Sequence, residues 1–234
     1  MNEEKQPLAV ETAKLCKIYQ QGQLAVHALS DVDLRIEAAE LVVLAGPSGS
    51  GKSTLLNLIG ALDRPSSGEI KVGGRDIGSM SGAERAALRR DHVGFVFQAY
   101  NLLPVLSALE NAELVLELQG LPRAQCQKRA QEVLRSVGLG EMFGRRPNEL
   151  SGGQQQRVAV ARAIASARTL VLADEPTANL DSKAAESLLD MMVELNQRQG
   201  LTFLFSSHDP RVVARARRVV HLEDGRIVAD EVVR

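Results

Sequence analysis

Residues 46–53 read Gly-Pro-Ser-Gly-Ser-Gly-Lys-Ser, the spacing GxxxxGK[ST] that binds phosphate. Small residues let the backbone fold tightly, so that successive N–H groups point at anionic oxygens. Lys52 supplies a cation for the β- and γ-phosphates of a nucleotide, and the Ser53 hydroxyl can ligate Mg²⁺. The motif lies between a predicted strand at 41–46 and a predicted helix at 53–62, which is the context it requires. The predicted phosphate loop consists of Gly46, Pro47, Ser48, Gly49, Ser50, Gly51, Lys52, Ser53 and Thr54.

Two acidic residues, Asp174 and Glu175, follow directly on the apolar run at 169–173. Ending so apolar a strand in two carboxylates is costly unless the carboxylates have a cation or a catalytic task. Beside a phosphate loop, Asp174 is predicted to hold Mg²⁺, directly or through water. Glu175 lies one residue further along and is predicted to polarise the attacking water as general base.

These residues need an α/β scaffold, and strand-like and helix-like stretches do alternate along the chain. The N-terminal stretch 8–40 reads as antiparallel strands, residues 99–155 as a helical insert, and Asp224-Gly225 as the turn of a hairpin. We therefore expect one domain over 1–234, with an α/β core, an N-terminal antiparallel β subdomain and a helical subdomain at about 99–155. Further strands are expected at 69–74, 93–97, 169–174 and 201–207, and helices at 108–120, 123–138, 152–166 and 182–198.

The composition is that of an ordinary globular protein of 234 residues, 44% hydrophobic and 24% charged. The net charge of −1 gives no indication of a nucleic-acid partner. No apolar run approaches the roughly 18 residues of a spanning helix, and the N-terminal MNEEKQPLAV lacks the apolar region of a secretory signal. Cys16 and Cys126 lie far apart in the sequence and are expected to be reduced thiols.

A second motif, LSGGQQQR at 150–157, resembles the signature of ATP-binding subunits of ABC transporters. Ser151, Gly152 and Gly153 open a predicted helix, and a helix N-terminus binds anions. One molecule has no evident use for two such sites on one triphosphate. The resemblance implies that two subunits pack head to tail, with the signature of one, including Gln154, at the γ-phosphate held by the other. The result is a homodimer around two ATPs.

Other residues resemble further elements of the same family, which has a P-loop NTPase fold with a RecA-like core. The resemblance implies that Tyr19 stacks on adenine and that the Gln98 amide reaches Mg²⁺ or the attacking water. It implies that Asp181 reaches across the dimer, and that His208 contacts the γ-phosphate and orders the water. The implied ligands are ATP and Mg²⁺, and the implied reaction is hydrolysis of ATP. The other histidines match no family element and are expected to be structural or exposed: His27, His92 and His221.

The resemblance also implies a separate membrane permease, which would place this chain at the cytoplasmic face of the inner membrane. In the family, the permease inserts a short coupling helix into a groove beside the Q-loop, the loop that holds the glutamine that Gln98 resembles. The segment 99–116 follows Gln98 and is unusually apolar for a surface element. It is suited to line such a groove or to form the core of the helical subdomain, and both roles are compatible.

Three segments, 61–74, 95–111 and 174–182, resemble the branch that serves lipoprotein release and macrolide export. Ala178 stands where that branch usually has glycine. The resemblance implies a permease that transmits a mechanical stroke across the membrane. Two alternatives stay open: the ATPase of a solute importer, and the ATPase of a cell-division-type complex that does not transport. The cargo is bound by the partner, so this sequence does not identify it.

Overall fold

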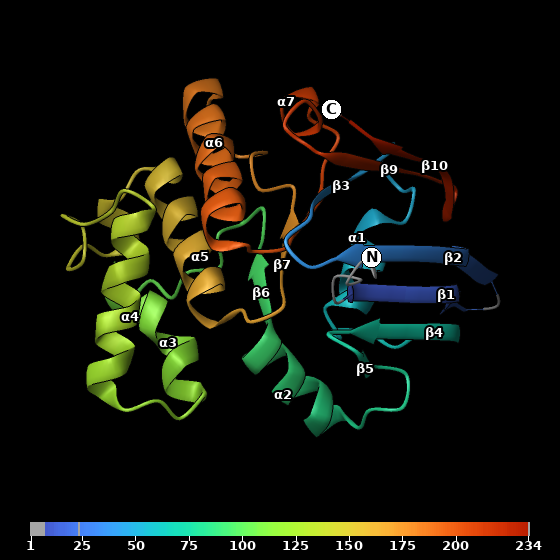
Figure 1. Ribbon diagram of the computed structural model, residues 1–234, viewed down its shortest axis with the longest axis horizontal. Coiled ribbons are helices and arrows are strands. Elements are labelled where there is room, and N and C mark those ends of the chain that lie inside the picture. Colours follow the sequence, from blue (N-terminus) through green and yellow to red (C-terminus); the bar gives the residue numbers. More distant parts are fainter. Residues whose placement is uncertain (1–7, 23, 234) are drawn as a thin grey trace, which may run out of the picture.

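Two β-sheets lie next to each other in the computed structural model, which describes residues 8–22 and 24–233 (Figure 1). Residues 1–7, part of the segment from which no secretory signal is expected, lie outside this range. The smaller sheet is antiparallel, in the order β2-β1-β4-β5. Its strands are β1 (Leu8–Gln21), β2 (Leu24–Glu37), β4 (Ser67–Val72) and β5 (Arg75–Asp76).

The larger sheet has the order β10-β9-β3-β8-β7-β6. Strands β9, β3, β8, β7 and β6 are parallel, so their carboxyl ends meet at one edge, while β10 pairs antiparallel with β9. The strands are β3 (Leu41–Ala45), β6 (Val93–Val96), β7 (Leu170–Asp174), β8 (Phe203–Ser206), β9 (Arg218–Glu223) and β10 (Arg226–Val232).

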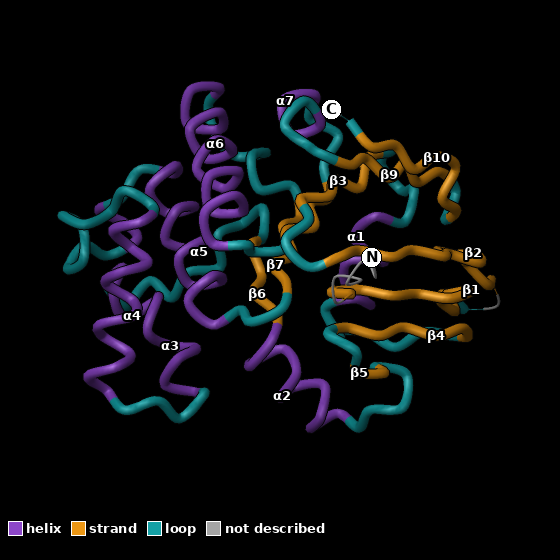
Figure 2. The backbone as a smooth tube through the Cα atoms, viewed as in Figure 1, coloured by secondary structure: helices purple, strands orange, loops and turns teal. Residues whose placement is uncertain are grey.

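Four of the helices gather on one side of the molecule, whereas α1 and α7 lie on the other side with the antiparallel strands (Figure 2). Helices α3, α4, α5 and α6 lie at the left of this view, and β6 and β7 lie between them and the smaller sheet. The helices are α1 (Lys52–Ile59), α2 (Gly82–His92), α3 (Ala108–Leu118), α4 (Arg123–Ser136), α5 (Gly152–Ser166), α6 (Ser182–Gln199) and α7 (Pro210–Val213), with a 3₁₀ turn at Pro147–Glu149.

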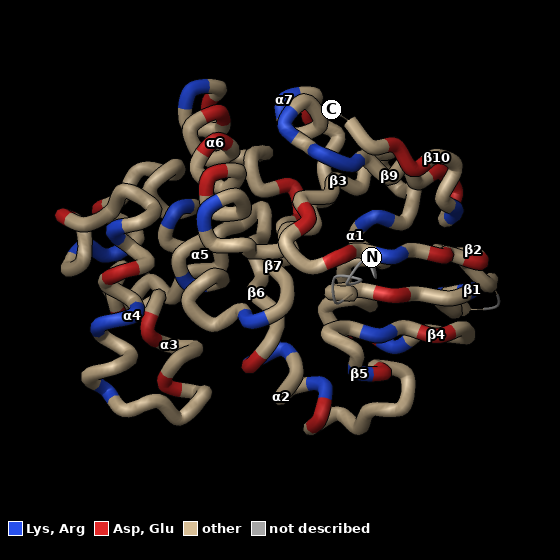
Figure 3. The backbone as a smooth tube through the Cα atoms, viewed as in Figure 1, with Lys and Arg blue, Asp and Glu red and all other residues tan. Residues whose placement is uncertain are grey.

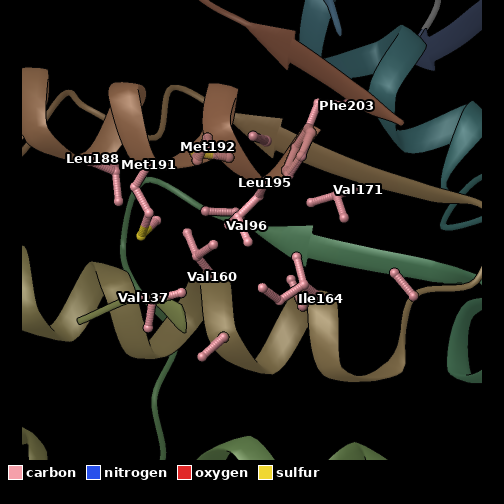
Figure 4. Close-up of a cluster of buried hydrophobic side chains, with 14 of the residues drawn as sticks. Val96, Val137, Val160, Ile164, Val171, Leu188, Met191, Met192, Leu195 and Phe203 are labelled. Atoms are coloured by element: carbon pink, nitrogen blue, oxygen red, sulfur yellow. The ribbon is translucent and has the colours of Figure 1, made fainter. Parts of the chain in front are cut away.

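Each strand of the parallel sheet buries both of its faces, because side chains alternate between two cores. In β8, Phe203 and Phe205 belong to the core that contains residues of α5 and α6, whereas Leu204 belongs to the core that contains residues of α1. Figure 4 shows the first of these cores, with Val160 of α5 and Met192 of α6 close to β6. The parallel sheet is therefore held between helices on one side, and α1 and the smaller sheet on the other.

The strands and helices expected from the sequence are present, with small shifts of their ends. Asp224 and Gly225 have φ angles of 44° and 74° and form the expected turn between β9 and β10. Helix α2 was not expected, since only Leu88 among its residues is buried and its apolar stripe is correspondingly faint. Its start is nevertheless marked in the sequence, because Ser81 and Glu84 form a capping box there.

Charged residues of both signs are interspersed along α6, β9 and β10 (Figure 3). Arg218 of β9 lies 2.7 Å from Asp230 of β10 and 3.1 Å from Glu40, which precedes β3. The hydrogen bond to Asp230 raises the pKa of the Arg218 guanidinium, against the opposing effect of burial. The pair with Asp230 lies within the C-terminal hairpin, and the pair with Glu40 joins this hairpin to the residue before β3. Within 8–22 and 24–233, no helix combines the length and the hydropathy needed to cross a membrane.

Candidate nucleotide site

A cavity of about 570 Å³ opens at the carboxyl ends of β3, β7 and β8. This is the edge of a parallel α/β sheet where ligands usually bind. The cavity brings together most of the predicted phosphate loop with Glu175 and His208. Its lining residues are Val26, His27, Ala28, Pro47, Ser48, Gly49, Gly51, Lys52, Ser53, Thr54, Glu175, Ser206 and His208.

The phosphate loop turns sharply from the end of β3 into the start of α1, and its glycines allow close packing. Gly46 has φ 148°, and a Cβ atom there would lie 2.1 Å from the carbonyl oxygen of Leu222. Gly51 has φ 103°, and its Cβ would lie 2.6 Å from the carbonyl oxygen of Ala28. Neither position accepts another residue without moving a neighbouring backbone. The loop is thereby placed at the N-terminus of α1, where the helix favours anions.

Lys52 is buried, with its ammonium group folded back onto the loop itself. The Nζ atom donates to the carbonyl oxygens of Gly46, at 2.7 Å, and of Pro47, at 2.8 Å. An ammonium group has three protons, so one is left for a phosphate oxygen. The loop therefore holds the cation in place before any phosphate arrives.

Ser53 and Asp174 form the pair of residues suited to a magnesium ion. The Ser53 hydroxyl donates to Asp174 Oδ1 at 3.3 Å, which joins the start of α1 to the end of β7. Among the described residues there is no cluster of three or more metal-binding side chains. A hydroxyl and a carboxylate nevertheless fit Mg²⁺, because this ion keeps several waters and takes further oxygens from substrate phosphates.

Glu175 lies at the cavity with both of its carboxylate oxygens engaged. Oε1 lies 2.6 Å from His208 Nδ1, and Oε2 accepts from the Ser207 hydroxyl at 3.1 Å. The backbone of Glu175 has φ 45°, a left-handed conformation, and its N–H donates to the carbonyl oxygen of Ser206 at 2.9 Å. Contacts from the end of β8 and from the residues that follow it therefore hold Glu175 in position. His208 contacts this carboxylate and lines the same cavity as the phosphate loop.

Tyr19 of β1 is half-buried beside the cavity without lining it. Its hydroxyl donates to Asp63 Oδ2 at 2.8 Å, and burial, followed by the Asp63 carboxylate, raises the pKa of this hydroxyl. Lys17 Nζ lies 4.7 Å from the centroid of the Tyr19 ring and 2.8 Å from Asp63 Oδ1. Lys17 covers one face of the ring, so only the opposite face can stack on a base.

The signature residues begin α5 and do not line the cavity. The Ser151 hydroxyl accepts from the Gln154 N–H at 3.3 Å, and Gln154 Oε1 accepts from the Ser151 N–H at 2.9 Å. A Cβ on Gly152 would lie 2.9 Å from Tyr100 Oη, and one on Gly153 would lie 3.2 Å from the Cβ of Ala184. The two glycines thus allow close packing, and the helix start is a capped N-terminus away from the phosphate loop.

Gln156, one turn into α5, ties the signature helix to two loops. Its side-chain amide donates to the carbonyl oxygen of Pro176 at 2.8 Å and to that of Phe97 at 3.4 Å. These carbonyls belong to residues directly after Glu175 and directly before Gln98. The side chain of Gln156 is completely buried, so α5 is held against both loops by a buried contact.

Gln98 and Asp181, two further predicted site residues, also lie outside the cavity lining. The side chain of Gln98 is exposed, and the backbone carbonyl oxygen of this residue accepts from the Asn179 side chain at 2.9 Å. The Asp181 carboxylate caps α6 by accepting from the Ala184 N–H at 2.9 Å. Within one chain the structure therefore gathers the phosphate loop, Glu175 and His208, and leaves the signature and Asp181 apart from them.

Comparison with known proteins identifies the family. The model of the family described as "ABC transporter" matches residues 29–178, which is more than half of the chain. The chain belongs to the ABC transporter family. This chain, called the cassette below, is similar to the solved structure of the ATP-binding cassette MJ0796 bound to ADP and Pi, a dimer in a post-hydrolysis state. The two are 41% identical, with a TM-score of 0.88. That similarity covers 96% of this chain and 99% of the other.

Two curated relatives resemble the cassette over nearly its whole length. The lipoprotein-releasing system ATP-binding protein LolD of Anaeromyxobacter dehalogenans (strain 2CP-C) is 48% identical over 96% of both chains. The macrolide export ATP-binding/permease protein MacB of Rhodopseudomonas palustris (strain HaA2) is 48% identical over 94% of this chain. The chain spans only about a third, 34%, of the length of that MacB protein. The predicted P-loop NTPase fold and the predicted family, that of ABC transporters, are confirmed.

Three residues in or next to the cavity were not predicted to be site residues: His27 and Ser206, which line it, and Ser207, which donates to Glu175. His27 is exposed and lines the cavity from β2, and it matches no motif that marks a site residue. The two serines end the apolar run LTFLFSS immediately before His208. Two hydroxyls at the end of a buried strand, next to a predicted site histidine, were the signal that could have identified them.

Proposed function

We propose that the cassette binds ATP and Mg²⁺ in the cavity at β3, β7 and β8, and hydrolyses the ATP as one member of a pair. One observation carries the proposal: a phosphate loop, the Glu175 carboxylate and a histidine meet in one cavity, while a second capped helix start lies outside it. Asp174 is hydrogen-bonded to Ser53 of the same loop. The phosphate loop amides and Lys52 would bind the β- and γ-phosphates. Ser53 and Asp174 would hold Mg²⁺, which supplies neutralisation of phosphate charge when bound.

Glu175 is the proposed general base, acting on water that attacks the γ-phosphate in line. Its position is held by Ser207 and His208, which together engage both carboxylate oxygens. A base with an orienting partner on each oxygen keeps its direction toward the water. As the triphosphate enters, the exposed His208 ring would turn from Glu175 to the γ-phosphate, and the Gln98 amide would approach the metal-bound end of the nucleotide.

We propose pairing because the signature helix begins outside the cavity that contains the phosphate loop of its own chain. The start of α5 is capped and packed, so it offers N–H groups in a fixed direction. A two-fold dimer would place Ser151, Gly152, Gly153 and Gln154 of one cassette against the γ-phosphate held by the other. Asp181 would then act across the interface, and Tyr19 would stack on adenine with the ring face opposite Lys17.

We propose further that the cassette drives a membrane permease through an apolar groove next to Gln98. This groove, of about 290 Å³, is lined by Phe97 and Asn101 on the Q-loop side and by Leu114 and Val115 of α3. Val105, in the loop that leads into α3, is 73% exposed. An apolar groove suits the insertion of a short helix. Such docking would hold the cassette at the cytoplasmic face of the inner membrane.

The permease is proposed to be of the lipoprotein-release or macrolide-export kind. The relatives named LolD and MacB support this proposal, with 48% identity to the cassette. The helical subdomain at about 99–155, which contributes α3 to the groove, would then transmit movement between the nucleotide and the permease. Co-purification with the permease, followed by identification of its extracytoplasmic domain, tests this branch against a solute importer or a cell-division-type complex.

The variant Glu175→Gln tests the proposed chemistry. It keeps the shape of the side chain and removes the base, so we expect kcat to fall by about a hundredfold or more. ATP binding should persist, and the variant should accumulate as an ATP-bound dimer, measured by phosphate release and by size-exclusion chromatography with ATP. A Glu175→Gln protein that stays monomeric with ATP and hydrolyses it at the parent rate would refute the proposal.

A further inference from the structure

Ser206, the last residue of β8, has a buried hydroxyl without a protein partner. The side chain is only 1% exposed, and among the described residues no atom accepts from or donates to its Oγ. The same side chain lines the nucleotide cavity. A buried hydroxyl that makes no hydrogen bond is destabilising, and most buried polar groups have a partner.

The strand pairing places Ser206 at the floor of the cavity. It pairs with Leu44 of β3 on one side and with Asp174 of β7 on the other. Leu204, two residues earlier in β8, faces the core that contains residues of α1, and alternation directs Ser206 to the same face. The hydroxyl therefore lies on the side of the sheet that carries the phosphate loop, between the strand that leads into this loop and the strand that ends at Asp174.

The neighbouring hydroxyls show that this lack of a partner is specific to the site. Thr202, just before β8, is also buried, and its hydroxyl accepts from the Ala39 N–H at 3.0 Å. Ser207 donates to Glu175. Within 8–22 and 24–233, the only other buried hydroxyl without a partner belongs to Ser50 of the phosphate loop. Both unpartnered hydroxyls thus occur where the triphosphate is expected.

We infer that the Ser206 hydroxyl hydrogen-bonds the terminal phosphate of bound ATP, directly or through one ordered water. This inference rests on the proposed function. The hydroxyl would gain its partner when ATP binds and lose it when phosphate leaves. It would therefore report the presence of the γ-phosphate to β8, whose next residues, Ser207 and His208, hold Glu175. A contact made only to the terminal phosphate favours ATP over ADP.

The test is the variant Ser206→Ala, with binding of a non-hydrolysable ATP analogue and of ADP measured by calorimetry. We expect affinity for the analogue to fall about tenfold, as for the loss of a hydrogen bond to a charged group, and affinity for ADP to change less than about twofold. The thermal midpoint of the nucleotide-free variant should equal or exceed that of the parent, because the substitution removes an unpartnered hydroxyl.

Thr202→Val is the matched control, since it removes a buried hydroxyl that has a partner on the same segment. Its nucleotide-free midpoint should fall, with both affinities unchanged. The inference is overturned if Ser206→Ala binds the analogue as tightly as the parent, if it loses equal affinity for ADP, or if its nucleotide-free midpoint falls as in Thr202→Val. A parent protein that binds neither nucleotide would instead refute the proposed function.

Discussion

The nucleotide cavity and the apolar groove both border the parallel sheet, and they are built in opposite ways. The cavity is formed largely by one continuous stretch, residues 47–54, together with the ends of β7 and β8. The groove is lined by residues from three segments that lie far apart in the sequence: 93–101, which contains β6, helix α3 and helix α5. The cavity presents N–H groups and charges, whereas the groove presents mostly apolar side chains.

This difference teaches how each site is specified. A loop that binds phosphate works through its own backbone, so its residues must be adjacent and its glycines are required. A groove works through the shape left between packed elements, so its residues need only arrive there when the fold forms. Gln156 connects the two, because its amide bonds to a carbonyl beside the groove, that of Phe97, and one beside the cavity, that of Pro176.

The largest expected effect comes from removing the cation of the cavity with Lys52→Ala. The substitution leaves the carbonyl oxygens of Gly46 and Pro47 without their donor and removes the charge that faces the phosphates. We expect ATP affinity to fall by about a hundredfold or more, measured by calorimetry. If affinity is unchanged, the cavity does not bind phosphate through this loop, and the comparison with the groove fails.

The groove is tested by placing a charge in it with Val115→Asp. Burying an unpaired carboxylate under a docked apolar helix is unfavourable, so we expect recovery of the permease with the cassette to fall at least about tenfold. Leu118→Asp is the control, because Leu118 lies on the same helix, is 62% exposed and does not line the groove. Equal recovery of permease by the two variants would show that the groove is only a packing defect.

The smallest effect is expected at Asp209, a charged residue next to His208, which lines the cavity. A hydrogen bond from Arg211 lowers the pKa of the Asp209 carboxyl below its usual 3.8, against the opposing effect of burial. A lowered folded-state pKa stabilises the protein above the unfolded value, and this contribution is lost as pH falls through the folded value.

We therefore expect the free energy of unfolding of Asp209→Asn to differ from that of the parent by about 1 kcal/mol or less above pH ~5. The difference should shrink as pH falls below the usual value of 3.8, where the unfolded chain takes up the proton first and the folded protein follows at its lowered pKa. Urea unfolding over this pH range measures it. A difference that grows toward low pH would contradict the lowered pKa of Asp209 and a stabilising role for its contact with Arg211.

The features that could be predicted from sequence alone are those formed by residues that are adjacent in the chain. The phosphate loop at 46–54, the acids at 174–175 and the helix start at 151–154 each carry their chemistry in consecutive residues, so spacing identifies them. The α/β fold was predictable for the same reason, because buried strands and amphipathic helices repeat with local periods. Helix α2 was not, since a single buried residue, Leu88, gives almost no period.

Only the tertiary structure decided which of these residues meet. It brought His208 to Glu175 and Ser53 to Asp174, and it placed the signature helix outside the cavity of its own chain. It also left the Ser206 hydroxyl buried without a partner, a property that no sequence pattern encodes. Whether a side chain is buried and hydrogen-bonded depends on atoms of strands that are far apart in the chain. The positions of these atoms are determined only when the sheet is assembled.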